Sequence, residues 1–186
     1  MSENPANQNQ PLEGHAAHAR EAAKTGMLGF AVVTLSDTRT AENDKSGQYL
    51  HTAIAAAGHR VVQYAVVKDE PADVAAQLQS ALDDPEVAII VTNGGTGIAT
   101  RDTAYESVVG MLEKQLDGFG ELFRMLSYEE IGAAAMLSRA VAGIAAGRVI
   151  FSLPGSTKAV QLGMEKLILP QAGHLYYELH KDGGTG

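Results

Sequence analysis

The chain has 186 residues, of which 45% are hydrophobic and 19% charged, a composition typical of one soluble globular domain with its own core. A net charge of −8 argues against nucleic acid or an acidic membrane surface as the main partner. The absence of cysteine excludes disulfides, thiolate zinc sites and cysteine nucleophiles. No apolar run approaches membrane-spanning length, and residues 1–26 lack the apolar core of a signal peptide, so we expect a cytoplasmic protein.

The two ends of the chain lack an apolar pattern. Residues 1–26 are polar and rich in Asn, Gln, Glu and Ala, which predicts a flexible N-terminal tail. His15 and His18 are three residues apart in this tail, but no third ligand is near, so we interpret them as solvated side chains. Residues 181–186 are expected to form a loose C-terminus, which leaves residues 27–180 as a single α/β domain.

Apolar runs alternate with helical patterns in the first half of the domain. Residues 29–35 and 60–67 predict two strands. Between them, an apolar repeat at helical spacing predicts a helix that Asp44 or Ser46 can cap and that ends at Gly58.

The middle of the chain continues this alternation. A second helix is predicted to begin at Pro71, a residue suited to the first helical position, with its apolar side chains stacked on one face. The apolar run at residues 87–92 predicts a third strand that is buried on both faces. The helix that follows is expected to bury Leu112 and Leu116 and to be broken at residues 117–120.

The last third of the domain carries a stretch of small residues. Residues 121–137 predict one or two helices, interrupted near Gly132. The small residues within 132–147 indicate either close internal packing or a subunit contact. Residues 148–153 predict a fourth strand, and the helix after it is expected to end or kink at Pro170.

The third predicted strand leads into a loop rich in glycine and hydroxyl groups, at residues 93–102. Glycines allow positive φ angles and let a ligand approach the peptide N–H groups. Asp102 can cap the next helix, with Glu106 in its first turn, so strand, loop and helix start predict an anion-binding corner. The loop is neither a Walker loop nor a dinucleotide fingerprint, because no Gly-Lys-Ser/Thr follows and Thr100 replaces the final small residue.

The alternation of strands and helices predicts right-handed crossovers and a mostly parallel, doubly wound sheet flanked by helices. Ligands of such sheets bind beyond the carboxyl ends of the strands. This rule brings residues 37–44, Asp69, residues 94–102 and residues 154–158 to one edge. Carboxylates, a glycine loop, hydroxyls and a lysine at one edge suit a phosphoanhydride held by peptide N–H groups and a bridging Mg²⁺.

Several motifs, in this order, resemble the MoaB/MogA family of molybdenum cofactor biosynthesis proteins. They are Asn93-Gly94-Gly95-Thr96-Gly97, Arg101-Asp102, Gly118-Phe119-Gly120-Glu121, Leu137-Ser138-Arg139-Ala140 and Leu153-Pro154-Gly155-Ser156. The resemblance covers residues 29–177, and residues 123–132 are similar to the MoaB branch. It implies an α/β fold that assembles as homo-trimers or homo-hexamers and binds molybdopterin, a phosphorylated dithiolene pterin.

In active members of this family, the terminal phosphate of molybdopterin attacks the α-phosphate of Mg-ATP, giving adenylylated molybdopterin and pyrophosphate. The resemblance implies catalytic roles for Asp69 and Asp102, and magnesium ligation by these two residues together with Asp44. Ligand contacts are expected from the glycine loop, the turn after the fourth strand and two basic side chains. These residues are Asn93, Gly94, Gly95, Thr96, Gly97, Arg101, Pro154, Gly155, Ser156 and Lys158.

Two functional hypotheses follow, an adenylyltransferase and a non-catalytic molybdopterin-binding or scaffold protein. The acidic residues at the strand ends favour the first, because a simple phosphate binder gains nothing from added carboxylates. Departures from the family pattern at Asn93, Ala104 and Tyr105 favour the second. A third interpretation makes each aspartate a helix cap, which is less convincing for three aspartates at successive strand ends.

Overall fold

The computed structural model describes residues 25–181, so the predictions for residues 1–24 and 182–186 lie outside the described part of the chain. The strands are β1 (Gly29–Leu35), β2 (Arg60–Val67), β3 (Ile89–Asn93), β4 (Lys114–Gln115), β5 (Val141–Ala145) and β6 (Arg148–Leu153). The α-helices are α2 (Lys45–Ala56), α3 (Pro71–Asp83), α4 (Ala104–Met111), α5 (Asp117–Ile131), α6 (Thr157–Gly163) and α7 (Leu169–His180). Two further helical segments are η1 (Gly132–Leu137) and η2 (Met164–Ile168).

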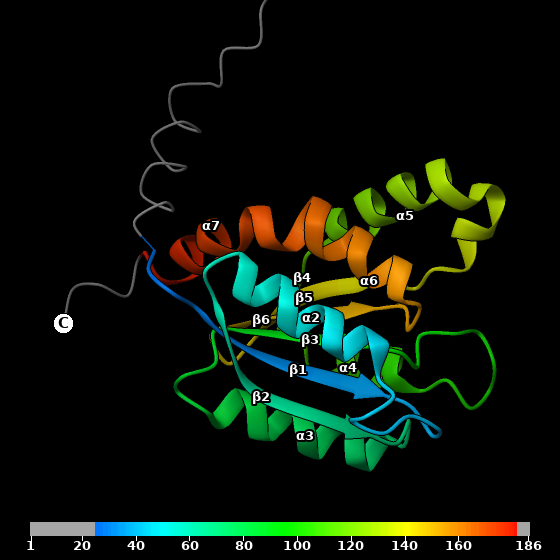
Figure 1. Cartoon of the computed structure of the whole chain (residues 1–186), viewed down its shortest axis with the longest axis horizontal. Coiled ribbons are helices and arrows are strands. Elements are labelled where there is room, and N and C mark those ends of the chain that lie inside the picture. The colour runs from blue at the N-terminus through cyan, green and yellow to red at the C-terminus, as the bar shows by residue number, and fades with distance from the viewer. Residues whose placement is uncertain (1–24, 182–186) are drawn as a thin grey trace, which may run out of the picture.

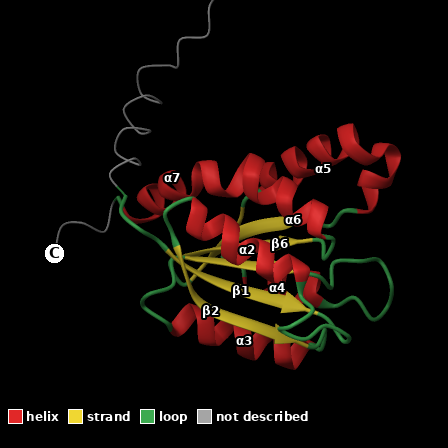
Figure 2. Cartoon of the chain, in the orientation of Figure 1, coloured by secondary structure: helices red, strands yellow, loops and turns green. Residues whose placement is uncertain are grey.

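One six-stranded sheet crosses the molecule in the order β2-β1-β3-β6-β5-β4 (Figure 1). The first four strands in this order are parallel to one another, whereas β5 runs antiparallel to both of its neighbours, β6 and β4. Helices α3 and α4 cover one face, and α2, α5, α6 and α7 cover the other (Figure 2). The predicted mostly parallel, helix-flanked sheet is confirmed, with an antiparallel extension at one edge.

Burial on both faces explains why the central strands are apolar runs rather than alternating patterns. All seven residues of β1 and all five of β3 are buried. Leu50 and Ile54 of α2 pack on one face of the sheet, and Val74 and Leu78 of α3 pack on the other. Parallel pairing of β2, β1, β3 and β6 brings their carboxyl ends to one edge of the sheet, and the helices cover its two faces.

The small residues after position 140 form a strand that sequence periodicity did not predict. β5 pairs with β6 through a tight hairpin in which Ala146 and Gly147 have φ angles of 45° and 69°. This backbone conformation is the one that two-residue hairpins favour. A Cβ on Gly143 would lie 2.4 Å from the carbonyl oxygen of Lys114, so small size here serves close strand packing.

The helix after the glycine loop is shorter than expected. It ends at Met111, and Glu113 and Leu116 donate backbone hydrogen bonds to Ile144 and Ala142. Residues 117–120 begin α5 instead of breaking a helix, so that prediction is wrong. The physical reason is the pairing of residues 113–116 with β5, which helical periodicity cannot reveal.

Pro170 does not end the last helical region, which continues to His180. Proline lacks the N–H that would bond to an earlier turn, and a π-helical segment, η2, lies directly before α7. Among residues 25–181, no helix combines the length and the apolar character that crossing a membrane requires.

Candidate functional site

The loops after β1, β3 and β6 meet at the carboxyl edge of the sheet. The N–H of Gly94 donates to the carbonyl of Leu153, which continues the pairing of β3 with β6 into the turns. A Cβ on Gly155 would lie 3.1 Å from the Cα of Gly94, so the two turns are in contact. The expectation that these segments share one edge agrees with this geometry.

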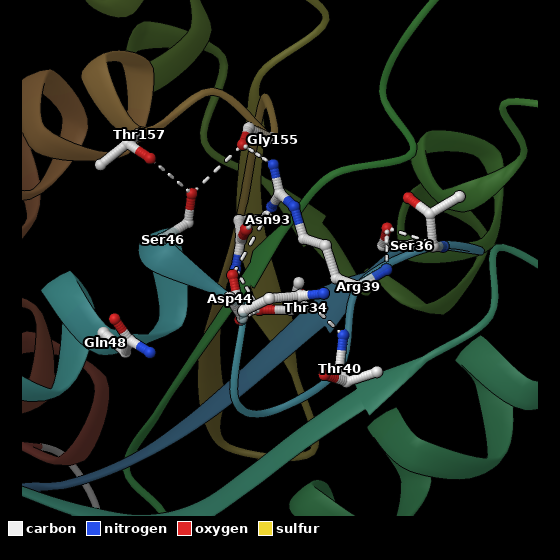
Figure 3. Close-up of polar contacts among 12 residues, drawn as sticks. Thr34, Ser36, Arg39, Thr40, Asp44, Ser46, Gln48, Asn93, Gly155 and Thr157 are labelled. Atoms are coloured by element: carbon white, nitrogen blue, oxygen red, sulfur yellow. Dashed lines mark hydrogen bonds and ion pairs between the residues drawn. The ribbon is translucent and has the colours of Figure 1, made fainter.

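Arg39 contacts residues from all three of these segments, after β1, at the end of β3 and after β6 (Figure 3). Its Nη2 donates to the carbonyl oxygen of Gly155 at 2.8 Å, and its Nη1 donates to Oδ1 of Asn93 at 3.5 Å. The same Nη1 lies 3.6 Å from Oδ1 of Asp44. Arg39 was not predicted as a site residue, and its only signal in the sequence is its position in the polar loop after the first strand.

Asp44 belongs to a buried hydrogen-bond network. Its Oδ2 accepts hydrogen bonds from the hydroxyls of Thr34 and Tyr64, and Asn93 Nδ2 donates to Thr34 Oγ1 at 2.9 Å. The pKa of Tyr64 is raised to about 12, mainly by burial and in addition by the hydrogen bond to Asp44. Asp44 occupies the N-cap position of α2, one of the two positions predicted for it, but its side chain makes no capping hydrogen bond.

The turn after β6 carries three of the predicted ligand residues, Pro154, Gly155 and Ser156. The carbonyl of Gly155 accepts from Arg39 and, at 3.2 Å, from the Ser46 hydroxyl, so it is engaged within the protein. Ser156 caps α6 by accepting the N–H of Ala159. Lys158, in the first turn of α6, is exposed.

Asp69 follows β2 and is buried against the start of α4. Its Oδ1 accepts from the backbone N–H of Thr103 at 3.3 Å and from the Thr103 hydroxyl at 3.2 Å. Burial raises the pKa of Asp69 above its ordinary value, the bonds from Thr103 lower it, and the nearby charge of Asp102 raises it further. The Asp69 carboxylate lies beside Gly95 of the glycine loop, and the Asp102 carboxylate lies beside Gly97 of the same loop.

The sequence predicted that Asp102 can cap the next helix, but in the structure it does not. Helix α4 begins at Ala104, so Thr103 occupies the capping position, and Asp102 lies one residue too early. The Asp102 Oδ2 instead accepts the N–H of Ala99 at 2.9 Å, which closes the end of the glycine loop. The carboxylate lies against Gly97, where a Cβ would be 2.3 Å from Oδ2.

Two glycines of the loop have backbone conformations that favour glycine. Gly94 and Gly95 have φ angles of 102° and 63°. A Cβ on Gly94 would lie 2.2 Å from the carbonyl oxygen of Leu35, and one on Gly95 would lie 2.5 Å from Oδ2 of Asp69. These glycines therefore let the loop approach β1 and place its backbone beside the Asp69 carboxylate.

Arg139 holds the glycine loop from the other side. Its Nε donates to the carbonyl oxygen of Thr96 at 3.0 Å, and its Nη2 donates to those of Gly97 and Asp102. Its guanidinium also pairs with Glu106 and lies 4.7 Å from the centre of the Tyr105 ring. Arg139 belongs to one of the motifs of the resemblance, but its contacts could not be predicted from the sequence because its partners are mostly backbone carbonyls.

Arg101, predicted as a ligand contact, pairs with carboxylates of two other loops. Its Nε donates to Asp37 Oδ2 at 2.7 Å, and its Nη2 donates to Glu70 Oε1 at 3.3 Å. The hydrogen bond from Arg101 lowers the pKa of Asp37. Arg101, in the loop after β3, thus links that loop to the loops that follow β1 and β2.

The three aspartates expected to bind magnesium do not form one cluster. Within residues 25–181, no three His, Asp or Glu side chains are grouped so that they could hold a metal ion. Asp44 is engaged with Thr34 and Tyr64, away from the contact that Asp69 makes with Thr103. The structure keeps Asp69 and Asp102 together and separates Asp44 from them.

Comparisons with known proteins agree with this architecture. A family model described as a probable molybdopterin binding domain matches residues 31–174. Molybdenum cofactor biosynthesis protein B of Bacillus cereus is 48% identical over 165 residues, which cover 88% of this chain and 96% of the relative. The protein of the same name in Bacillus subtilis is 46% identical over 166 residues, which cover 89% and 96%.

Solved structures give the same assignment. A crystal structure of molybdenum cofactor biosynthesis protein B matches with a TM-score of 0.83 and 49% identity, covering 84% of this chain and 98% of that one. The tungsten cofactor synthesizing protein MoaB from Pyrococcus furiosus matches with a TM-score of 0.75 and 37% identity, covering 82% and 97%. The chain therefore belongs to the MoaB family of molybdenum cofactor biosynthesis proteins.

Proposed function

We propose that this protein binds molybdopterin and adenylylates it with Mg-ATP. A phosphate oxygen of molybdopterin attacks the α-phosphorus of ATP, a new P–O bond forms, and the bond to the β-phosphate oxygen breaks to release pyrophosphate. The observation that carries the proposal is the pair of carboxylates, Asp69 and Asp102, beside the glycine loop at the carboxyl edge of the sheet. A site that only binds phosphate would not gain from this pair.

The carboxylate pair fits a magnesium ion. Magnesium binds carboxylate oxygens, and two carboxylates suffice when substrate phosphates and water complete the shell. The charge of Asp102 raises the pKa of Asp69, and a cation between them would relieve this repulsion. Bound there, Mg²⁺ would neutralise negative charge on the reacting phosphates. Asp69 Oδ2 faces Gly95, so the ion would lie beside the loop backbone.

The protein's own contribution is to hold the phosphates in place. Positive φ angles at Gly94 and Gly95 give the loop an irregular backbone whose peptide N–H groups serve as phosphate donors. Arg139 holds the carbonyls of Thr96 and Gly97, which keeps these donors in one arrangement. Preorganised donors stabilise charge at the reacting phosphorus without reorganisation during the reaction.

A second candidate function is molybdopterin binding without turnover. The ion pairs of Arg101 with Asp37 and Glu70 favour it, because they engage a basic side chain that a phosphate would otherwise use. The exposed position of Lys158 and the departures at Asn93 and Tyr105 point the same way. In this case the same edge would bind the pterin phosphate and present it to a partner enzyme.

Pyrophosphate release from ATP, with purified molybdopterin and Mg²⁺, separates the two functions. We expect turnover by the wild type and a loss of about 10²–10³-fold in Asp102→Asn, the scale of one lost electrostatic contact in the transition state. The asparagine can still accept the Ala99 N–H, so folding is preserved. Asp83→Asn, at the exposed end of α3, is the matched control. Molybdopterin binding without pyrophosphate release by the wild type would establish the second function.

We further propose that the chain forms a homo-oligomer, a trimer or hexamer as its family resemblance implies. Leu122, Met125, Tyr128 and Ile131 recur every three residues along α5 and are 47–64% exposed. A continuous exposed apolar ridge of this kind marks an interaction surface. The proposed contact keeps η1 from the expected range 132–147 and adds α5, but it leaves out β5, which is an internal strand of the sheet.

Sedimentation tests the assembly. The wild type should sediment as a trimer or hexamer at micromolar concentration, and Met125→Glu should dissociate it by placing a charge within the ridge. Glu129→Gln, an exposed change on the same helix, should leave the assembly intact. A monomeric wild type would contradict the proposal.

A further inference from the structure

Asp44 is the one predicted metal-binding aspartate that the proposed magnesium site does not use. Its side chain is fully buried, and its Oδ2 accepts hydrogen bonds from Thr34 and Tyr64. Its Oδ1 has no hydrogen-bond partner within residues 25–181, and the cation paired with it is Arg39, whose Nη1 lies 3.6 Å away. A buried charge is costly unless it is paired. The Asp44 carboxylate therefore needs Arg39 as its counter-ion.

Three oxygen atoms from different segments lie around the end of the Arg39 guanidinium (Figure 3). They are Oδ1 of Asp44, Oδ1 of Asn93 and the carbonyl oxygen of Gly155. A carboxylate, an amide and a carbonyl oxygen are also the ligands that hard metal cations prefer. Here the guanidinium occupies the space between them, so the third predicted aspartate holds an arginine instead of magnesium.

The Nε of Arg39 has no protein acceptor. In the described part of the chain, Nη1 and Nη2 are both engaged, but Nη2 carries two hydrogens and the Gly155 carbonyl takes only one of them. The buried side-chain atoms that lack a partner there include Nε of Arg148 but not Nε of Arg39, so solvent reaches the Arg39 Nε. The Arg39 side chain as a whole is 32% exposed.

The other two arginines that contact the glycine loop use their Nε within the protein. Nε of Arg101 donates to Asp37, and Nε of Arg139 donates to the carbonyl of Thr96. In a guanidinium, Nε and Nη2 form the side of the fork that binds two oxygens of one phosphate or carboxylate. Of these three arginines, Arg39 is the one whose fork is still available to an anion.

Arg39 lies at the start of the glycine loop, whereas the carboxylate pair lies further along it. A Cβ on Gly155 would be 3.9 Å from Nη1 of Arg39 and 3.1 Å from the Cα of Gly94. The carboxylates of Asp69 and Asp102 lie against later glycines of the same loop. A phosphate compound along this loop would meet a fixed cation at the start of the loop and metal-binding carboxylates beyond it.

We propose that Arg39 binds one phosphate group at the start of the glycine loop, through Nε and Nη2 and without a metal ion. Asp44 is its positioning residue, because it fixes the guanidinium and does not itself contact the phosphate. An arginine that is already held in place loses little freedom when the anion binds, so the contact is preorganised. The inference rests on the proposed function, for which it names the protein cation that contacts a substrate phosphate.

Two kinds of phosphate share this chemistry, a phosphate monoester and the phosphoanhydride of a nucleotide. Calorimetry of the full chain with glycerol 3-phosphate and with inorganic pyrophosphate represents them separately. Both titrations are done in EDTA, because the proposed contact does not depend on a metal ion. The probe whose affinity depends more strongly on Arg39 identifies the kind of phosphate that binds there.

The double variant Arg39→Gln/Asp44→Asn removes the cation together with its buried counter-ion, so no buried charge is left unpaired. It should bind at least one probe about tenfold more weakly or worse, the effect of losing a charge-assisted hydrogen-bond pair. Its remaining affinity should also depend less on salt, since salt screens interactions between charges. Arg60→Gln/Glu86→Gln removes an exposed ion pair at the start of β2 and is the matched control, with a change of less than about twofold.

Arg39→Lys keeps the charge but not the fork, so it should lose part of the affinity and keep the salt dependence of the wild type. Wild-type affinity for both probes in either Arg39 variant would overturn the inference. A loss of affinity with unchanged salt dependence in the double variant would overturn it too, because a merely structural role of Arg39 gives that result.

The wild type provides the remaining test. Failure of the wild type to bind either probe at millimolar concentration would also overturn the inference. None of these results affects the proposed function if the wild type still releases pyrophosphate from ATP with molybdopterin. Probe binding that depends on Arg39, in a wild type that releases no pyrophosphate, would support the inference and contradict adenylylation.

Discussion

Replacing Arg139 with lysine tests how the glycine loop is held. The guanidinium donates to the carbonyls of Thr96, Gly97 and Asp102 and pairs with Glu106. A lysine ammonium keeps the positive charge, but it is a single point charge and cannot make the same forked contacts. We therefore expect the variant to fold while its loop loses part of its support.

The size of the effect follows from these contacts. Lysine would lose about two charge-assisted hydrogen bonds, each worth about 1.5–3 kcal/mol when a buried partner is left unpaired. Gly97 is exposed and its carbonyl can bind water, so the lower end of this range applies. We expect a loss of about 3 kcal/mol in the free energy of unfolding and a fall in Tm of about 6–12 °C.

Urea unfolding and thermal melts of Arg139→Lys measure this loss. Arg60→Lys is the matched control, because Arg60 makes a surface ion pair with Glu86 at 2.7 Å. Such pairs contribute about 0–1 kcal/mol, so the control should retain nearly all of its stability. Equal losses in the two variants would refute the assignment of Arg139 as the anchor of the loop.

Three further predictions concern the carboxylates and glycines at the edge. Burial holds the pKa of Asp69 above the ordinary value of 3.8, so its contribution to stability is present below pH 3.8 and is lost as pH rises through the folded pKa. As the pH rises through the folded pKa, Asp69→Asn should therefore become more stable relative to the wild type. A difference in the free energy of unfolding in urea that does not change with pH would contradict this. Asp102→Asn should lower the pKa of Asp69, measured by carboxyl NMR, because it removes the nearby negative charge. An unchanged pKa of Asp69 in this variant would show that the two carboxylates do not interact. Gly95→Ala should cost about 1–3 kcal/mol more in urea unfolding than Gly58→Ala, because both residues have positive φ but only Gly95 has neighbours that a Cβ would hit; equal costs would argue against the close approach to Asp69.

Much of the fold could be predicted because the parallel core has local signatures. The predicted strands at residues 29–35, 60–67 and 148–153 are the observed ones, since each is an apolar run whose neighbours are turn residues. The third strand was predicted at residues 87–92 and is observed at 89–93, which places Asn93 inside the sheet. The rule that ligands bind at the carboxyl edge then located the candidate site without any coordinates.

The antiparallel edge of the sheet could not be predicted in the same way. β5 is made of small residues without alternation, and β4 has only two residues. The segment at residues 113–116 is extended because of backbone hydrogen bonds to β5 about thirty residues away, as between Glu113 and Ile144, whereas β5 itself is held on its other side by the hairpin with β6. Long-range pairing of this kind leaves no period in the sequence.

The division of roles among the aspartates was also decided by the tertiary structure. The sequence alone placed Asp44, Asp69 and Asp102 at successive strand ends, where each had the same capping and metal-binding possibilities. Only the folded chain brings Thr34 and Tyr64 to Asp44, which engages that carboxylate internally. It leaves the other two near each other beside the glycine loop.

The sequence by itself therefore determined the elements whose stability comes from local pattern: the buried strands, the amphipathic helices and the glycine-rich turns. The tertiary structure alone decided which charged side chains face one another. Arg39 and Arg139 bind carbonyls of residues up to 116 positions away, and a carbonyl has no side-chain identity from which a sequence could predict such a contact. The chemistry of the edge depends on these contacts, because they determine which charges remain available to a ligand.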